Sequence, residues 1–164
     1  DINFLKEGKV KNAIYSFMAY YMTMSGLMFY IIPSVTEVLS LAIHSMIWHM
    51  ILIVVGIILL VKGNYGKNYK EIIPAVIVFI ILVVIATTMN IVVYHTIVKD
   101  TTESFSMFYI SPYFISELPV YNIVQQNVPY IVYLMIYIIS IFGGSFIVCI
   151  IAKISEKCYN LNMK

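Results

Sequence analysis

The stretch Ile72–Val98 reads IIPAVIVFIILVVIATTMNIVVYHTIV and contains no charged side chain. Three further runs of similar length also lack charged residues, namely Ala13–Pro33, Val38–Val61 and Pro129–Ala152. The hydrocarbon of a bilayer is about 30 Å thick, and a helix of about 20 residues crosses it. Because 62% of the 164 residues are apolar, one soluble core of this size cannot bury them. The sequence therefore predicts an all-α membrane bundle with four transmembrane helices.

The lysines predict how the chain is oriented. Nine of the ten lysines form three clusters, before the first run, between the second and third, and after the fourth: Lys6, Lys9, Lys11, Lys62, Lys67, Lys70, Lys153, Lys157 and Lys164. Four crossings put all three clusters on one side of the membrane, which the positive-inside rule identifies as the cytoplasm. We therefore expect a multi-pass cell-membrane protein with both termini of this segment in the cytoplasm. The net charge of +2 is too small to indicate nucleic-acid binding.

The chain is predicted to form a single membrane domain over residues 1–164. Its opening stretch, Asp1–Val10, is polar and has neither the apolar region nor the cleavage site of a signal peptide. It is typical of a loop within a longer chain. We therefore expect further helices upstream.

Residues 99–128, between the third and fourth runs, form a connection that is long for a compact bundle. It is rich in aromatic and aliphatic residues, so it is not a disordered linker. Pro112 and Pro119 exclude one long helix. We predict a hydrophobic re-entrant or interfacial flap on the outer side of the membrane. Four amides form a polar lip before the fourth run, Asn122, Gln125, Gln126 and Asn127.

Hydrogen-bonding side chains within the runs gather in the predicted outer half of the bilayer. Polar groups in hydrocarbon need partners, so they mark packing contacts or functional sites. Their distribution predicts a polar cavity that opens to the outer leaflet beneath the flap. Six residues are candidates for substrate binding there: Thr23, Ser25, Thr87, Tyr94, Tyr109 and Tyr113.

His49 is the sharpest candidate for chemistry. Ser45 lies one helical turn before it, within hydrogen-bonding reach. Burial keeps an imidazole neutral and able to act as a general base. A histidine that serves packing alone is the competing interpretation. His44 lies on another face of the same helix, and His95 is expected to be solvated near the membrane surface.

Neither a metal nor a cofactor is expected. The sequence has no HExxH or CxxC motif, and Cys149 and Cys158 are spaced for neither zinc nor redox chemistry. The absence of carboxylates within the runs argues against an ion-coupled transporter. Ser140, Gly143 and Gly144 predict a close contact with a partner helix, because small side chains let backbones approach.

These features together resemble the YwaF-like integral membrane family, over about Ala13 to Ala152. The residues that carry the resemblance are Gly26, Pro33, the Ser45-x-x-x-His49 spacing, Asn90 and the stretch SFSMFYISPYFISELPVYNIVQQNVPY at Ser104–Tyr130. That family is similar to a eukaryotic transmembrane acyltransferase that moves acyl chains between phospholipids with an intramembrane cysteine and histidine. The resemblance implies that His49 is the family histidine and Asn90 the asparagine of the neighbouring helix. The cysteine would lie on a helix upstream of Asp1.

Three functional hypotheses follow. The first is a lipid-active enzyme in which His49 acts as base or acid, while Ser45 and Asn90 orient it or stabilise an oxyanion. Membrane lipids are then its partners, and the flap binds the headgroup. The second is a non-enzymatic protein that binds lipid or a small molecule, or a transporter component, with the same outer cavity. The third is a structural subunit.

Overall fold

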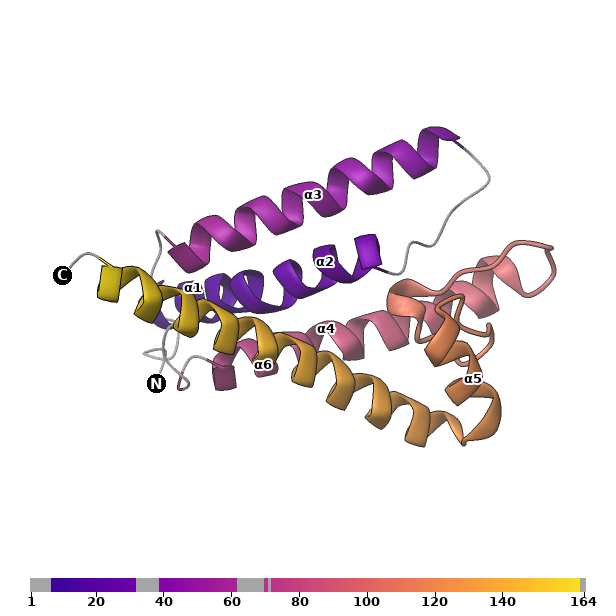
Figure 1. The fold of residues 1–164 in the computed structure, drawn as a ribbon. Coiled ribbons are helices and arrows are strands. Elements are labelled where there is room, and N and C mark those ends of the chain that lie inside the picture. Colours follow the sequence, from indigo (N-terminus) through magenta and orange to yellow (C-terminus); the bar gives the residue numbers. More distant parts are fainter. Residues whose placement is uncertain (1–6, 32–38, 62–69, 71, 163–164) are drawn as a thin grey trace. The chain divides into compact units, whose positions relative to one another are not determined.

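Every element that the described residues form is a helix. The computed structural model describes residues 7–31, 39–61, 70 and 72–162. In chain order, the elements are α1 (Glu7–Phe17), the π-helical turn η2 (Met18–Met22), α2 (Thr23–Ile31), α3 (Leu39–Val61), α4 (Ile72–Val93), the π-helical turn η4 (Tyr94–Val98), the 3-10 turn η5 (Met107–Tyr109), α5 (Pro119–Asn127) and α6 (Tyr130–Asn162). Figure 1 shows them in sequence colours.

Three helices in the described part are long and apolar enough to cross a membrane. They contain Ala42–Val61, Ile72–Val98 and Tyr130–Glu156, in agreement with three of the predicted runs. Of their most apolar stretches, only 11% to 22% is buried inside the protein. Isoleucine and valine make up most of the large hydrophobic side chains exposed on these helices, which is the surface expected for helices solvated by lipid. The chain is therefore a multi-pass membrane protein.

The segment Glu7–Ile31 is helical throughout but is not among these three. It begins within the polar N-terminal stretch, and its apolar part carries several tyrosines together with Thr23 and Ser25. The predicted turn at 34–38, and the loop at 62–71 apart from Lys70, lie outside the described residues.

The last helix is longer than its apolar run. The predicted membrane run ends at Ala152, whereas α6 continues to Asn162. Hydropathy indicates where a helix leaves the hydrocarbon. The helix itself can continue until residues such as proline or glycine disfavour the helical conformation. Residues 153–162 contain neither proline nor glycine.

The chain divides into two compact units. The first unit comprises Asp1–Phe79 and Ile141–Lys164, and the second comprises Ile80–Ser140. Helices α4 and α6 each contribute residues to both units. The polar side chains singled out in the sequence are thereby split, with His49 and Ser45 in the first unit and Asn90 in the second.

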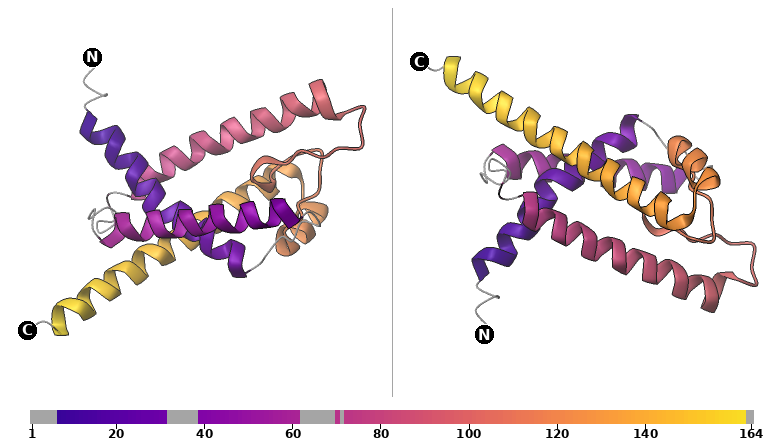
Figure 2. Two further views of the ribbon diagram at one scale, coloured as in Figure 1. Left: turned by 90° about the horizontal axis from the view of Figure 1, so that it is seen from above. Right: turned by 90° about the horizontal axis from the view of Figure 1, so that it is seen from below.

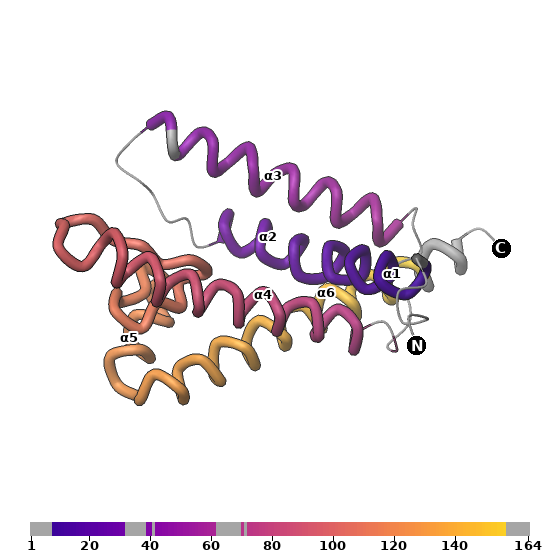
Figure 3. Tube along the Cα trace, turned by 180° about the vertical axis from the view of Figure 1, so that it is seen from behind, coloured from indigo at the N-terminus to yellow at the C-terminus, as the bar shows by residue number. Residues whose placement is uncertain are grey.

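In the first unit, α3 runs alongside η2 and α2 (Figures 1 and 3). Two glycines permit this close approach. A Cβ atom at Gly26 would lie 2.8 Å from the carbonyl oxygen of His49 and 2.7 Å from Cγ1 of Ile53. A Cβ atom at Gly56 would overlap the hydroxyl of Thr23, which is buried. The α2 and α3 backbones therefore approach each other at both glycines.

We expect Gly56→Ala and Gly26→Ala to destabilise the first unit, each by about 1–3 kcal/mol, because the added methyl group overpacks the α2–α3 contact. Thermal unfolding in detergent measures the effect. Gly143→Ala is the matched control, because no atom lies within 4 Å of its Cβ position and alanine is the better helix former. Equal melting temperatures for the three variants would contradict this account of the contact.

In the second unit, the chain after α4 folds back along its own helix before entering α5 and α6 (Figure 2). The prolines set the boundaries of these elements. Pro119 opens α5, where its missing N–H is not needed, and Leu118 before it is extended. Val128 is extended in the same way before Pro129, and α6 begins at Tyr130. Pro119, predicted only to exclude a long helix, thus starts a short one.

Candidate functional site

The imidazole of His49 is anchored within its own helix. Its Nδ1 lies 2.7 Å from the carbonyl oxygen of Ser45 and 3.4 Å from the hydroxyl oxygen of Ser45. A carbonyl oxygen only accepts hydrogen bonds, so the shorter contact requires the proton on Nδ1. In the neutral ring, Nε2 then keeps the lone pair and is the basic nitrogen. The predicted contact between Ser45 and His49 is present, and its dominant partner is the backbone.

Helix α2 supplies one wall of this site. The ring of Phe29 stacks on that of His49, with centroids 4.0 Å apart and planes 6° apart. Gly26, one turn earlier on α2, meets the backbone of His49 itself. The imidazole is half-buried, and the stack determines its ring plane. The α2–α3 contact thus positions the acid–base candidate.

The other candidates of the first unit are dispersed. Thr23 is buried against Gly56 with no hydrogen-bond partner for its hydroxyl among the described residues. Ser25 and His44 are exposed. No hydrogen bond or ring contact joins Thr23 or Ser25 to His49 in the described residues. Their roles in substrate binding therefore stay predictions.

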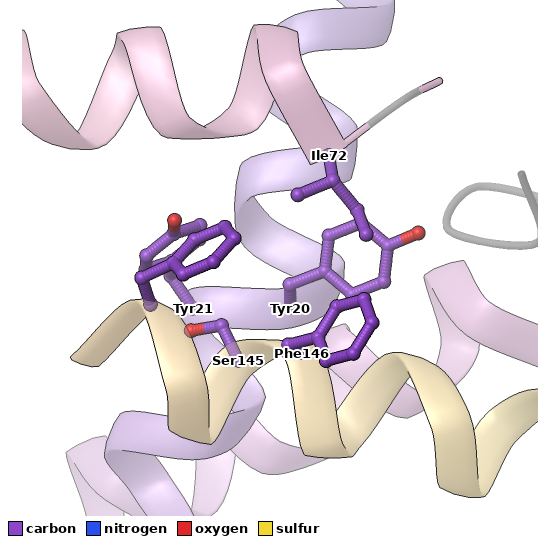
Figure 4. A pocket seen from close by; sticks show the side chains of 6 residues that line it. Tyr20, Tyr21, Ile72, Ser145 and Phe146 are labelled. Carbon is purple, nitrogen blue, oxygen red and sulfur yellow. The ribbon is translucent and has the colours of Figure 1, made fainter. Parts of the chain in front are cut away.

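A small recess lies elsewhere in the first unit, between η2 and α6. It is lined by Tyr20, Tyr21, Ile72, Phe142, Ser145 and Phe146 (Figure 4). Its lining is almost wholly apolar, and it has no room for a water molecule. Tyr21 stacks on Phe79, and Ser145 donates to the carbonyl oxygen of Ile141 in its own helix. This recess is a packing feature rather than a site for a ligand.

Asn90 in the second unit is fully buried and bonds the backbone of one residue. Its Oδ1 accepts from the N–H of Met107 at 2.7 Å, and its Nδ2 donates to the carbonyl oxygen of Met107 at 3.1 Å. Asn90 lies eight residues before the end of η4 at Val98, which is roughly 12 Å along the helix at 1.5 Å per residue. The connection therefore folds back alongside α4 to the level of Asn90.

Gln125 on α5 holds the rest of the connection. Its Oε1 accepts from the N–H of Ser116 at 2.7 Å, while its Nε2 donates to the carbonyl oxygens of Ser111 at 2.9 Å and Phe114 at 3.1 Å. Asn122, one turn earlier, donates to the carbonyl oxygen of Ser116 at 3.1 Å. These amides form hydrogen bonds with backbone N–H and C=O groups that lie outside the helices and so have no partner within a helix.

Two tyrosines of α6 complete this set of contacts. The hydroxyl of Tyr130 donates to the carbonyl oxygen of Ile110, and that of Tyr133 to the carbonyl oxygen of Tyr109. Phe108 and Tyr109 both have φ of 59°, in the left-handed region that side chains other than glycine rarely adopt. The surrounding hydrogen bonds hold this turn in place.

An aromatic cluster lies between η4 and the connection that follows it. Tyr94 stacks on Tyr113, with centroids 3.8 Å apart, and meets Phe114 edge-on. Nε2 of His95 lies 3.0 Å from the hydroxyl of Tyr113. His95 is exposed, as predicted, but this hydrogen bond was not foreseen. Thr87 has a buried hydroxyl with no hydrogen-bond partner in the described chain.

Ser140, Gly143 and Gly144, which are predicted to contact a partner helix, have different surroundings in the structure. Ser140 bonds the hydroxyl of Tyr121 at 2.5 Å and the carbonyl oxygen of Tyr137 at 2.8 Å. Gly144 meets the side chain of Met24, and Gly143 faces open space. A partner helix at these residues stays a prediction.

The described residues that could bind a metal or react as thiols are few and dispersed. Across residues 7–31, 39–61, 70 and 72–162, no three His, Cys, Asp or Glu side chains lie close enough together to hold a metal ion. Cys149 is buried and not disulfide-bonded, and the side chain of Cys158 lies outside the described set.

Five polar residues of the second unit share one structural role. Buried backbone groups outside a regular helix must find their hydrogen bonds elsewhere in the protein. Asn90, Asn122, Gln125, Tyr130 and Tyr133 supply them to residues 107–116. The sequence marked Gln125 and Asn122 only as members of a polar lip. The placement of amides within an otherwise apolar segment is the feature that identifies this role.

Comparisons with models of protein families, with curated proteins and with solved structures gave no match.

Proposed function

We propose that this chain is a lipid-active membrane protein in which His49 transfers protons during acyl transfer or hydrolysis. The observation that carries the proposal is the hydrogen bond from Nδ1 of His49 to the carbonyl oxygen of Ser45. It leaves Nε2 basic on a helix that is long and apolar enough to cross a membrane. Ionisable groups in such helices are costly and are usually retained for function. The resemblance to the YwaF-like family supports the same proposal.

In this proposal the run Ala13–Pro33 is a fourth span, and both termini face the cytoplasm. Its close packing against α3 at Gly26 and Gly56 supports that position, because α3 is itself apolar enough to span. The lysine clusters support the orientation. The connection after α4 then lies on the outer side as a flap. Its aromatic residues Tyr109 and Tyr113 suit the headgroup region.

The proposed roles of the remaining candidates follow from this arrangement. Ser45 orients His49 through its carbonyl oxygen, rather than by a nucleophilic hydroxyl. Asn90 stabilises a developing oxyanion only when the connection releases its amide, since both of its polar atoms now bond Met107.

We expect His49→Ala to lower phospholipid turnover by the full-length protein in vesicles by about 10²–10⁴-fold, the usual contribution of a general acid or base. Mass spectrometry of the lipids measures turnover. His44→Ala is the matched control, because His44 is exposed on the same helix. A wild-type protein without turnover, or a His49→Ala variant as active as wild type, would remove the proposal.

A second function, lipid binding without catalysis, has a specific observation in its favour. The amides of Asn90 and Gln125 hold the protein backbone and present no unused polar atom to a substrate. In that case His49→Gln would leave lipid co-purification unchanged, and no variant would alter lipid composition.

A further inference from the structure

Helix α5 turns two of its amides inward and two of its aliphatic side chains outward, while the amides of its last turn, Gln126 and Asn127, are exposed. Asn122 and Gln125 point to the backbone of residues 111–116, as their hydrogen bonds show. Val120 and Ile123 lie on the opposite side of the helix at 100° per residue, and they are 62% and 65% exposed. Ile115, just before α5, is 54% exposed. A short helix that faces water usually buries its aliphatic side chains, whereas Val120 and Ile123 in the first turns of α5 are exposed.

We propose that lipid acyl chains cover this outward face of α5, which we define as Ile115, Val120 and Ile123. The proposal needs the chain to be embedded in a membrane, and it does not depend on chemistry at His49. The occupant is inferred from the continuity of this face with the apolar surface of the neighbouring helices. Within the second unit, α6 starts two residues after α5, and its exposed residues include Ile131, Val132, Met135 and Ile139.

The depth of α5 along α6 supports a position within the bilayer. The hydroxyl of Tyr121 lies 2.5 Å from Oγ of Ser140. Ser140 is ten residues into α6, roughly 15 Å from its start at 1.5 Å per residue. The first turn of α5 therefore lies beside the interior of α6 rather than at its outer end.

One charge limits how deeply this face is immersed. Glu117 is the only charged residue between Ser104 and Ala152, and it is exposed directly before α5. Its carboxylate must reach the headgroups or water, because an unpaired charge in hydrocarbon is costly. α5 thus lies in the outer part of the acyl-chain region, close enough to the headgroups for Glu117 to reach them.

Tryptophan quenching in vesicles tests this placement. Trp48 is the only tryptophan, so Trp48→Phe provides a silent background. Val120→Trp and Ile123→Trp then report on the outward face. Ile139→Trp, on the exposed surface of α6, is the control for lipid contact, and Thr102→Trp, in the exposed polar turn after η4, is the control for water.

We expect phosphatidylcholine with brominated acyl chains to quench residues 120 and 123 as strongly as residue 139, with blue-shifted emission. Iodide should quench only residue 102 strongly. Strong iodide quenching at 120 and 123 would show a water-facing helix and overturn the proposal. Quenching by neither agent would show that protein, such as a second copy of the chain, covers the face, and would also overturn it. His49→Ala should leave all of these values unchanged, which separates this test from that of the proposed function.

Discussion

Gln125→Glu is expected to unfold the connection between η5 and α5 while leaving the spanning helices intact. Gln125 uses both sides of its amide, as an acceptor from Ser116 and as a donor to Ser111 and Phe114. A carboxylate keeps the first hydrogen bond but places an oxygen against two carbonyl oxygens. Each buried backbone group left without a partner costs about 1–3 kcal/mol, and the charge itself adds to the cost.

Hydrogen–deuterium exchange over residues 107–118 measures this effect. Gln126→Glu is the matched control, because it adds the same charge at the neighbouring position. Gln126 is exposed and bonds only Asn122 within its own helix. Exchange should accelerate in Gln125→Glu and change little in Gln126→Glu. Equal protection in the two variants would show that Gln125 does not hold the connection.

Asn90→Leu is expected to have the second-largest effect, because leucine has a similar size but no hydrogen-bonding group. The N–H of Met107 then loses its partner, at a cost of about 1–3 kcal/mol, and its carbonyl oxygen keeps only the longer hydrogen bond from the N–H of Ile110 at 3.4 Å. We expect a lower melting temperature in detergent and faster exchange at Met107.

Thr88→Val is the control for this prediction. Thr88 lies two residues away on α4, is exposed, and bonds only the carbonyl oxygen of Val84 in its own helix. The anchoring role of Asn90 would be contradicted if Asn90→Leu had the same melting temperature as Thr88→Val and kept slow hydrogen–deuterium exchange at Met107.

Hydropathy alone was sufficient to predict the three helices that are long and apolar enough to cross a membrane. Three of the four runs correspond to helices that can span, because a long uncharged stretch has no other stable state in a bilayer. The fourth prediction, at Ala13–Pro33, is a helix whose tyrosines and hydroxyls make it less apolar. The fourth apolar run ends at Ala152 and α6 continues beyond it to Asn162, since helix and hydrocarbon end for different physical reasons.

The candidate site was less predictable. The spacing of Ser45 and His49 is enough to bring them together, because residues four apart on a helix are neighbours. The stack of Phe29 on His49 is not visible in any local pattern, since it depends on the two close contacts at Gly26 and Gly56. The same is true of Asn90, whose partner Met107 is seventeen residues away.

What the sequence determined by itself is that the chain is helical and lies in a membrane, because uncharged runs of bilayer length leave no alternative. Only the tertiary structure decided what the polar side chains do. The sequence marks Asn90 as a site residue and Gln125 as part of a polar lip. In the structure, both amides form hydrogen bonds with the backbone of a non-helical connection. The fold of the chain decides which carbonyl oxygen each amide reaches. Hydrogen bonds between residues far apart in the sequence depend on three-dimensional packing. The spacing of residues along the chain does not predict that packing.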